Sequence, residues 1–124
     1  MIPHVLLVED SPLVVGALRL LLEETGFRVS AASTVREAVD AARAGRPDVI
    51  LLDITLQRED GLAVLADLAH TDELPRVAIA LTGHDDPMLR ERCLEAGCVD
   101  VLIKPIRAME LPGKIRGWLG GENA

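Results

Sequence analysis

The chain has 124 residues, of which 49% are hydrophobic and 27% charged, as expected for one globular domain with a substantial core. Its net charge of −7 argues against direct nucleic-acid binding, and no apolar run approaches the roughly 18–20 residues of a membrane span. The short N-terminal apolar run does not resemble a signal peptide. Cys93 and Cys98 lack a histidine cluster nearby, so we expect reduced packing residues in a cytoplasmic protein.

Short apolar runs alternate with amphipathic segments five times along the chain. This alternation predicts an α/β fold with a doubly wound parallel sheet of five strands covered by five helices. The second run is more polar than the others and is expected at an edge of the sheet. The expected strands are Val5–Val8, Arg28–Ser33, Val49–Leu52, Ala78–Leu81 and Val101–Ile103.

The first helix has clear start and stop signals. Ser11 is a suitable N-cap, Pro12 fits the first helical position, and Gly26 can take the left-handed position after the last turn. A helix is therefore predicted between Pro12 and Gly26.

Four further helices are predicted from similar signals. The capping box Thr34–Glu37 starts a helix that runs to about Arg43, before Gly45. Another follows Asp60-Gly61, with Leu62, Leu65 and Leu68 facing inward. The last two extend from Asp86-Pro87 to Gly97 and from about Ala108 to Leu119, with Pro112 tolerated in a first turn.

Polar groups follow four of the predicted strands at the point where each strand ends. Asp53 closes the third run, Glu9 and Asp10 follow the first, and Thr82 and Lys104 follow the fourth and fifth. The carboxyl ends of parallel strands meet at one edge of the sheet, so these five side chains are expected to share one pocket.

Three acids, a hydroxyl and an ammonium group suit a divalent cation and a phosphoryl group. Magnesium prefers oxygen ligands, which Glu9, Asp10, Asp53 and the backbone carbonyl of Thr55 could supply. A carboxylate nucleophile can accept a phosphoryl group, whose oxygens then need a metal, a lysine and a hydroxyl as partners. For Glu9 and Asp10 a second interpretation stays open, because acids before a helix also act as simple capping residues.

These motifs, in this order, make the chain resemble a receiver domain of the response regulators of two-component signalling. The resemblance extends from about His4 to Leu119, and residues 120–124 are expected to be a disordered tail. The matching motifs are Val8-Glu9-Asp10, Leu51-Leu52-Asp53, Asp60-Gly61, Leu81-Thr82-Gly83, Ala96-Gly97 and Lys104-Pro105.

The resemblance implies a flavodoxin-like fold with strand order 2-1-3-4-5 and a role for each matching residue. Asp53 would be the phosphoacceptor, and Glu9, Asp10, Asp53 and the Thr55 carbonyl would hold Mg²⁺. Thr82 and Lys104 would bind the phosphoryl group, and the Lys104-Pro105 bond would be cis.

It also implies partners. A histidine kinase or histidine phosphotransfer protein would supply the phosphoryl group, and a downstream protein or a second copy of the chain would receive the signal. The chain would not be an enzyme in the ordinary sense, since it would catalyse only its own phosphorylation and dephosphorylation. No direct contact with nucleic acid or membrane is expected.

The chain departs from the family pattern at a few positions. Val101 stands where many members carry an aromatic residue that rotates on activation, and Gln57 replaces a frequent proline. Thr55 and His84 occupy the two positions whose side chains tune loss of the phosphoryl group in the family. Because Val101 cannot make the aromatic rotation, output through the fourth and fifth helices is expected to be smaller or to follow another route.

Three alternatives compete with this interpretation. A haloacid-dehalogenase-like phosphatase needs a second aspartate two residues after the nucleophile, where this chain has Thr55. A flavodoxin-like cofactor protein needs a phosphate-binding loop after the first strand, where Glu9 and Asp10 would repel phosphate. A pseudo-receiver that is never phosphorylated remains open, with Val101 as its main support.

Overall fold

The computed structural model describes residues 2–120 and contains a five-stranded parallel sheet. The strand order is β2-β1-β3-β6-β7, which is the predicted 2-1-3-4-5 order once a separate two-stranded hairpin is set aside. The strands of this sheet are β1 His4–Val8, β2 Arg28–Ala32, β3 Val49–Asp53, β6 Val77–Thr82 and β7 Asp100–Ile103. The predicted fold class is confirmed.

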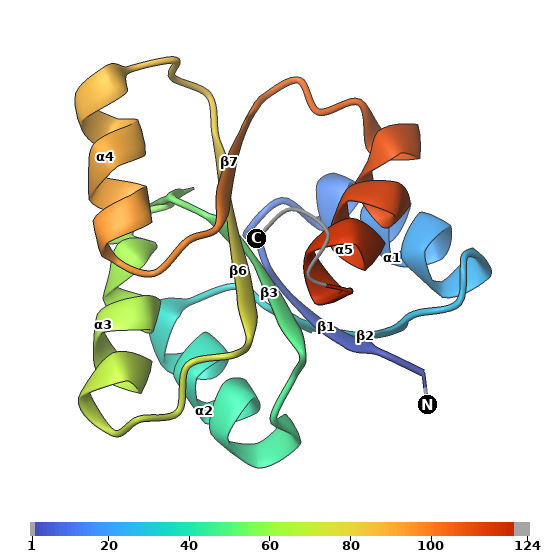
Figure 1. Cartoon of the computed structure of the whole chain (residues 1–124), viewed down its shortest axis with the longest axis horizontal. Helices are drawn as coiled ribbons and strands as arrows, with labels where there is room; N and C mark the ends of the chain where they lie inside the picture. The colour runs from blue at the N-terminus through green and yellow to red at the C-terminus, as the bar shows by residue number, and fades with distance from the viewer. Residues whose placement is uncertain (1, 121–124) are drawn as a thin grey trace.

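Helices cover both faces of the sheet (Figure 1). The pair α1 and α5 lies on one face, and α2, α3 and α4 lie on the other. The helices are α1 Pro12–Glu24, α2 Val35–Gly45, α3 Leu62–His70, α4 Pro87–Glu95 and α5 Leu111–Leu119. A 3₁₀ turn, η1 Ala108–Glu110, precedes α5.

The core is divided into two layers because successive side chains of a strand point to opposite faces. In β1, Val5 and Leu7 pack with α1 and α5, whereas Leu6 and Val8 pack with the three helices of the other face. Every residue of β1, β3 and β6 is buried. Phe27 is the single phenylalanine, so the core is aliphatic, as the composition predicts.

Most of the predicted helix boundaries are confirmed. Ser11 is the N-cap of α1 and its side chain accepts from the Val14 N–H, while Gly26 has a positive φ of 99°. Thr34 and Asp86 are likewise side-chain N-caps of α2 and α4. These caps satisfy N–H groups that have no partner inside the helix.

The end of α2 differs from the prediction. The helix continues to Gly45, and Arg46 rather than the glycine takes the left-handed conformation, with φ of 44°. The Cβ of a larger residue at position 45 would come 3.0 Å from the His4 ring. Gly45 therefore allows close packing against β1, and the left-handed residue after the helix is Arg46.

A short hairpin between β3 and α3 was not predicted. Its strands, β4 Thr55–Leu56 and β5 Glu59–Asp60, pair antiparallel, and Arg58 at the turn has φ of 69°. Two-residue strands carry no periodic signal, which explains why sequence patterns do not reveal them. This hairpin follows Asp53 directly and so borders the carboxyl edge of the sheet.

The two cysteines are free and buried, as predicted. The Cys98 N–H donates to the Cys93 carbonyl across Gly97, which has a positive φ of 114°. This is the pattern of a Schellman motif, in which the residues at these two positions make an apolar contact. The thiols thus belong to the end of α4 and to the core.

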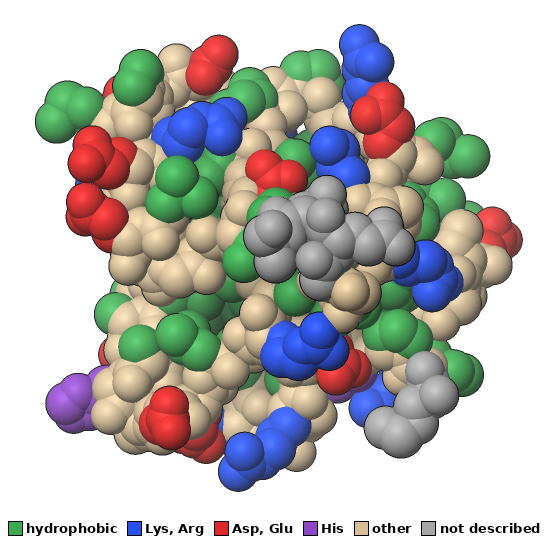
Figure 2. All heavy atoms as spheres, viewed as in Figure 1, with side chains coloured by type: hydrophobic (Ala, Val, Ile, Leu, Met, Phe, Trp, Pro, Cys, Tyr) green, Lys and Arg blue, Asp and Glu red, His purple; other side chains and the backbone are tan. Residues whose placement is uncertain are grey.

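Acidic and basic side chains are interspersed on the face shown in Figure 2, so this face has no continuous basic footprint. Within residues 2–120, no helix combines the length and hydrophobicity that a bilayer-spanning segment needs. Gly120 caps α5, and residues 121–124 of the predicted tail lie outside the described part of the chain.

Candidate functional site

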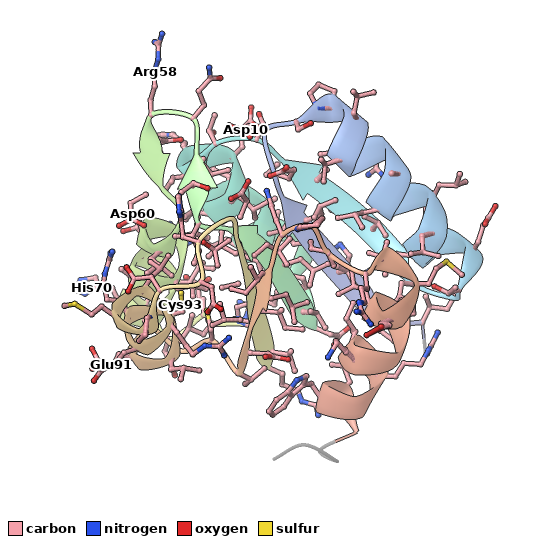
Figure 3. All side chains as sticks on the ribbon, turned by 90° about the horizontal axis from the view of Figure 1, so that it is seen from above. Asp10, Arg58, Asp60, His70, Glu91 and Cys93 are labelled. Atoms are coloured by element: carbon pink, nitrogen blue, oxygen red, sulfur yellow. The ribbon has the colours of Figure 1, made fainter. Side chains whose placement is uncertain are left out.

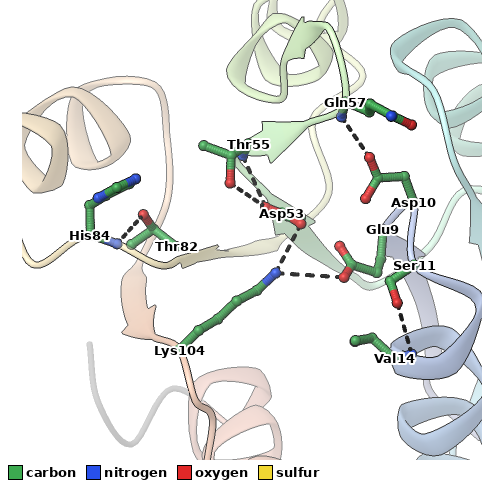
Figure 4. Close-up of polar contacts among 10 residues, drawn as sticks. All are labelled: Glu9, Asp10, Ser11, Val14, Asp53, Thr55, Gln57, Thr82, His84 and Lys104. Atoms are coloured by element: carbon green, nitrogen blue, oxygen red, sulfur yellow. Dashed lines mark hydrogen bonds and ion pairs between the residues drawn. The ribbon is translucent and has the colours of Figure 1, made fainter.

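Three acids meet at the carboxyl edge of the sheet (Figure 4). Glu9 and Asp10 follow the end of β1, and Asp53 is the last residue of the neighbouring strand β3. One carboxylate oxygen from each lies within 4.8 Å of the others. The parallel pairing of β1 with β3 therefore brings together the three acidic side chains, as the sequence pattern at the strand ends predicted.

Glu9 is the most unusual of these acids because it is only 3% exposed and its Oε2 has no hydrogen-bond partner within the described structure. Burial, followed by the neighbouring Asp53 carboxylate, raises the pKa of Glu9 to about 7. A buried carboxylate oxygen without a partner costs free energy. The site thus offers an unused ligand atom among clustered negative charges.

Lys104 connects two of the acids from the end of β7. Its Nζ lies 2.9 Å from Oδ2 of Asp53 and 3.5 Å from Oε1 of Glu9. Burial alone would raise the pKa of Asp53, but hydrogen bonds with Glu9 and Lys104 and the lysine charge lower it below its ordinary value. Burial would lower the pKa of Lys104, yet both carboxylates raise it. Asp53 is therefore held as a carboxylate.

The other oxygen of Asp53 is bound by the residue two positions later. The Thr55 N–H and hydroxyl donate to Oδ1 of Asp53 at 2.9 and 3.2 Å. Thr82 is 1% exposed, and its Oγ1 accepts the backbone N–H of His84 at 3.1 Å. In the described structure the Thr82 hydroxyl makes no hydrogen bond with Asp53, so it stands at the same edge without touching the acid.

Asp10 does not act as a capping residue of α1. Ser11 is the N-cap, and the first turn of the helix contains no acid. Instead, Oδ2 of Asp10 accepts the backbone N–H of Gln57 at 2.6 Å, from the β4–β5 hairpin. The capping interpretation that the sequence left open for Asp10 is therefore wrong.

Gly61 is required by the backbone next to Asp53. A Cβ at this position would lie 2.3 Å from the Asp53 carbonyl oxygen and 2.9 Å from the Cα of Ile54. The Gly61 N–H also donates to the Ile54 carbonyl at 2.8 Å. The sequence contains the Asp60-Gly61 motif, but only the fold gives its steric reason.

The donor set fits Mg²⁺, which prefers carboxylate and carbonyl oxygens. Three acids approach one another closely, and one of them has an unpartnered buried oxygen within the described structure. The sequence patterns did not predict the contacts around these ligands, which are made by Gln57 and by residues of β5. These contacts involve backbone groups and exposed ion pairs, which leave no sequence motif.

A doubly wound sheet with these groups at its carboxyl edge is the arrangement expected of a receiver domain. The family model "Response regulator receiver domain" matches residues 5–116, so the chain belongs to this family, which operates in phosphorylation-dependent two-component signalling. The Lys104-Pro105 peptide bond is cis, as the resemblance implied.

Among curated relatives, the chain is 36% identical to the transcriptional regulatory protein AfsQ1 of Streptomyces coelicolor, over 94% of this chain and 51% of the relative. It is 38% identical to the response regulator MprA of Mycolicibacterium vanbaalenii, with 94% and 50% coverage. The chain thus spans about half the length of these two relatives. The polar-differentiation response regulator DivK of Brucella anthropi is 36% identical and covered over 95% of its length.

Solved structures agree with the fold. The receiver domain of the sensor histidine kinase PA1611 from Pseudomonas aeruginosa, which has a magnesium ion coordinated in its active-site cleft, is 33% identical, with a TM-score of 0.85 and coverage of 97% and 99%. The receiver domain of a LuxO repressor protein from Vibrio parahaemolyticus has a TM-score of 0.89 at 27% identity, with coverage of 98% and 92%.

Proposed function

We propose that Asp53 accepts a phosphoryl group from a phosphohistidine of a histidine kinase or phosphotransfer protein, and that the chain then changes conformation to regulate a partner. The contact between Lys104 Nζ and Asp53 Oδ2, at 2.9 Å beside two further acids, carries this proposal. This contact places a carboxylate nucleophile next to a lysine cation that can pair with the oxygens of the incoming phosphoryl group.

Mg²⁺ is the proposed cofactor. Glu9, Asp10 and Asp53, together with the Thr55 carbonyl, would hold it, and the unpartnered Oε2 of Glu9 supports this assignment. When bound, Mg²⁺ supplies positive charge that offsets the acids and the phosphoryl oxygens. The magnesium ion in the cleft of the PA1611 receiver domain adds support from a relative.

In the proposed transfer, an oxygen of the Asp53 carboxylate attacks the phosphorus atom. An O–P bond forms as the N–P bond to the donor imidazole breaks, and the electron pair of the broken bond stays on the imidazole nitrogen. The low pKa of Asp53 keeps the nucleophile ionised, since Glu9 and Lys104 offset its burial. Lys104 then pairs with an oxygen of the transferred group.

Thr82 is the proposed switch residue. Its oxygen accepts from the His84 N–H, which leaves its hydroxyl hydrogen available for a phosphoryl oxygen on Asp53. Binding of that hydroxyl would bias an existing equilibrium of the loop between β6 and α4. Val101, whose partner in the sheet register is Ala80 of β6, is buried and is too small to make the aromatic rotation seen in the family.

The chain is proposed to catalyse only its own phosphorylation and dephosphorylation, and not to turn over a separate substrate. Its regulated target, a downstream protein or a second copy of the chain, would recognise the altered surface. A phosphatase of the haloacid-dehalogenase type is disfavoured, because Thr55 stands where that chemistry needs an aspartate.

Intact-mass spectrometry after incubation with acetyl phosphate tests the proposal. One phosphoryl group should be added with Mg²⁺, and none should be added after chelation or to Asp53→Asn, which preserves the size of the side chain. If the folded protein takes up no phosphoryl group from acetyl phosphate or from a panel of phosphorylated histidine phosphotransfer proteins, the pseudo-receiver interpretation replaces this one.

A further inference from the structure

The β4–β5 hairpin is hydrogen-bonded to the metal-binding acids at its start. The Thr55 N–H and hydroxyl donate to Asp53, and the Gln57 N–H donates to Oδ2 of Asp10 at 2.6 Å. Figure 3 shows Asp10 and the hairpin at the same edge of the molecule, with Arg58 at the turn pointing away. Two of the three clustered acids are therefore positioned in part by this hairpin.

The other strand of the hairpin is bound to three helices. Oε1 of Glu59 accepts the Val35 N–H at the start of α2, at 3.0 Å. Oδ2 of Asp60 forms an ion pair with Nη2 of Arg92 on α4, at 2.9 Å, while its Oδ1 accepts the Leu62 N–H at 3.0 Å. The single residue Asp60 thus joins the hairpin to the start of α3 and to the last turn of α4.

The backbone that follows the second strand of the hairpin is packed closely against Asp53. Gly61 follows Asp60 and is packed against the Asp53 carbonyl so closely that no Cβ fits there. Its N–H is bonded to the Ile54 carbonyl, and Ile54 is 4% exposed. A backbone movement of Asp60 can therefore be passed to the Asp53–Ile54 backbone through this close packing and this hydrogen bond.

We propose that Arg92 is a positioning residue for the metal site, which acts through Asp60 and the hairpin although it lies on α4. The inference rests on the magnesium site of the proposed function, but not on phosphorylation. Because coupling between two sites is reciprocal, Mg²⁺ binding must in turn strengthen the Asp60–Arg92 pair and be sensed at α4. This connection does not pass through Thr82 or Val101.

The size of the effect is limited by solvent. The side chains of Arg92 and Asp60 are 57% and 51% exposed, and exposed ion pairs contribute only weakly to stability. The coupling free energy between Arg92 and the Mg²⁺ site cannot exceed the free energy that the Asp60–Arg92 ion pair contributes. Loss of the pair is therefore expected to weaken Mg²⁺ binding by about two- to fivefold.

The test is a Mg²⁺ titration followed by calorimetry and by amide NMR of the full chain. Arg92→Gln should raise the Mg²⁺ dissociation constant about two- to fivefold, and Arg92→Lys should restore it. Arg43→Gln is the matched control, because Arg43 forms a 3.0 Å ion pair with Glu73 away from the site. It should leave the dissociation constant unchanged, although both glutamine variants lose a comparable ion pair.

A double-mutant cycle completes the experiment. Asp60→Asn keeps an oxygen that can accept from the Leu62 N–H, so it removes mainly the charge. The loss of Mg²⁺ affinity in the double variant should be smaller than the sum of the losses in Asp60→Asn and Arg92→Gln. In NMR spectra, the amides of Met88 to Cys93 should shift when Mg²⁺ is added to the wild type, and should shift less in Arg92→Gln.

Unchanged affinity in Arg92→Gln, or equal weakening in Arg43→Gln, would overturn this inference while leaving the magnesium site intact. If the wild-type protein does not bind Mg²⁺ at all, the metal site of the proposed function is wrong and the inference is overturned with it. The wild-type titration thus separates the two failures.

Discussion

Nζ of Lys104 lies 2.9 Å from Oδ2 of Asp53, although 51 residues separate the two in sequence. Asp53 ends the central strand β3, whereas Lys104 follows β7 at an edge of the sheet, with β6 between them. This contact therefore spans the intervening strand β6 and joins the central strand of the sheet to an edge strand.

Removal of the lysine should separate phosphorylation from the conformational response. In Lys104→Ala, Asp53 should still accept a phosphoryl group, because the acids and the carbonyl that would hold Mg²⁺ remain. The amides of α4 should no longer shift on phosphorylation, since the cation that would bind the new group is missing. Mass spectrometry measures the first effect and NMR the second.

The same variant should also be less stable without Mg²⁺ at pH 8, by about 1–3 kcal/mol, since Glu9 and Asp53 lose their shared cation. Urea denaturation checks this value. A full α4 response in Lys104→Ala would show that the lysine is dispensable for coupling.

Glu9 should make the Mg²⁺-free protein less stable as pH rises. Its pKa is raised from 4.5 to about 7, so native Glu9 retains a proton that an unfolded chain has released. This contribution is fully present below pH 4.5 and is lost as pH rises through about 7. Glu9→Gln should make the free energy of unfolding less dependent on pH. At pH 8 the variant should be more stable than the wild type by about 2 kcal/mol.

Denaturation in chelator between pH 5 and pH 8 measures this difference. Excess Mg²⁺ should restore the stability of the wild type at pH 8 and should stabilise Glu9→Gln less, because a neutral amide replaces one charged carboxylate ligand. Parallel pH profiles for the two proteins in chelator would contradict the prediction.

His84→Ala should change the rate of dephosphorylation severalfold. The His84 side chain is exposed beside Thr82, and only its backbone N–H bonds the Thr82 hydroxyl, so alanine keeps that bond and removes the ring alone. The phosphoryl lifetime is followed by mass spectrometry after removal of the donor. His70→Ala is the control, because His70 is also exposed but ends α3. An unchanged lifetime in His84→Ala would discard this role.

Gly61→Ala should destabilise the protein by about 3 kcal/mol or more, because its Cβ would overlap the Asp53 carbonyl. Gly16→Ala is the matched control. Gly16 lies inside α1, and a Cβ at this position would have nothing within 4 Å, so alanine should stabilise by up to about 1 kcal/mol. Urea denaturation compares both with the wild type, and a stable Gly61→Ala would show that the Asp53 backbone can move freely.

The sequence was sufficient to predict the sheet and the residues at its carboxyl edge. Buried runs that end in Asp53, Thr82 or Lys104 carry strong local patterns, and parallel topology then fixes their common location. The hairpin at Thr55–Asp60 was not predictable because its two-residue strands carry no periodic pattern. The Asp60–Arg92 pair was not predictable because its side chains meet only after α3 and α4 have packed. The extension of α2 to Gly45 was not predictable, because the close approach of Gly45 to His4 arises only in the folded structure.

The position of β7 has a consequence for how the molecule fluctuates. β1, β3 and β6 are fully buried and lie inside the sheet, whereas β7 is an edge strand with three half-buried residues. Local opening of β7 should therefore cost less free energy than opening of β3. Amide hydrogens of β7 will exchange with solvent ahead of those in β3, so Lys104 can withdraw from Asp53 while the interior stays closed.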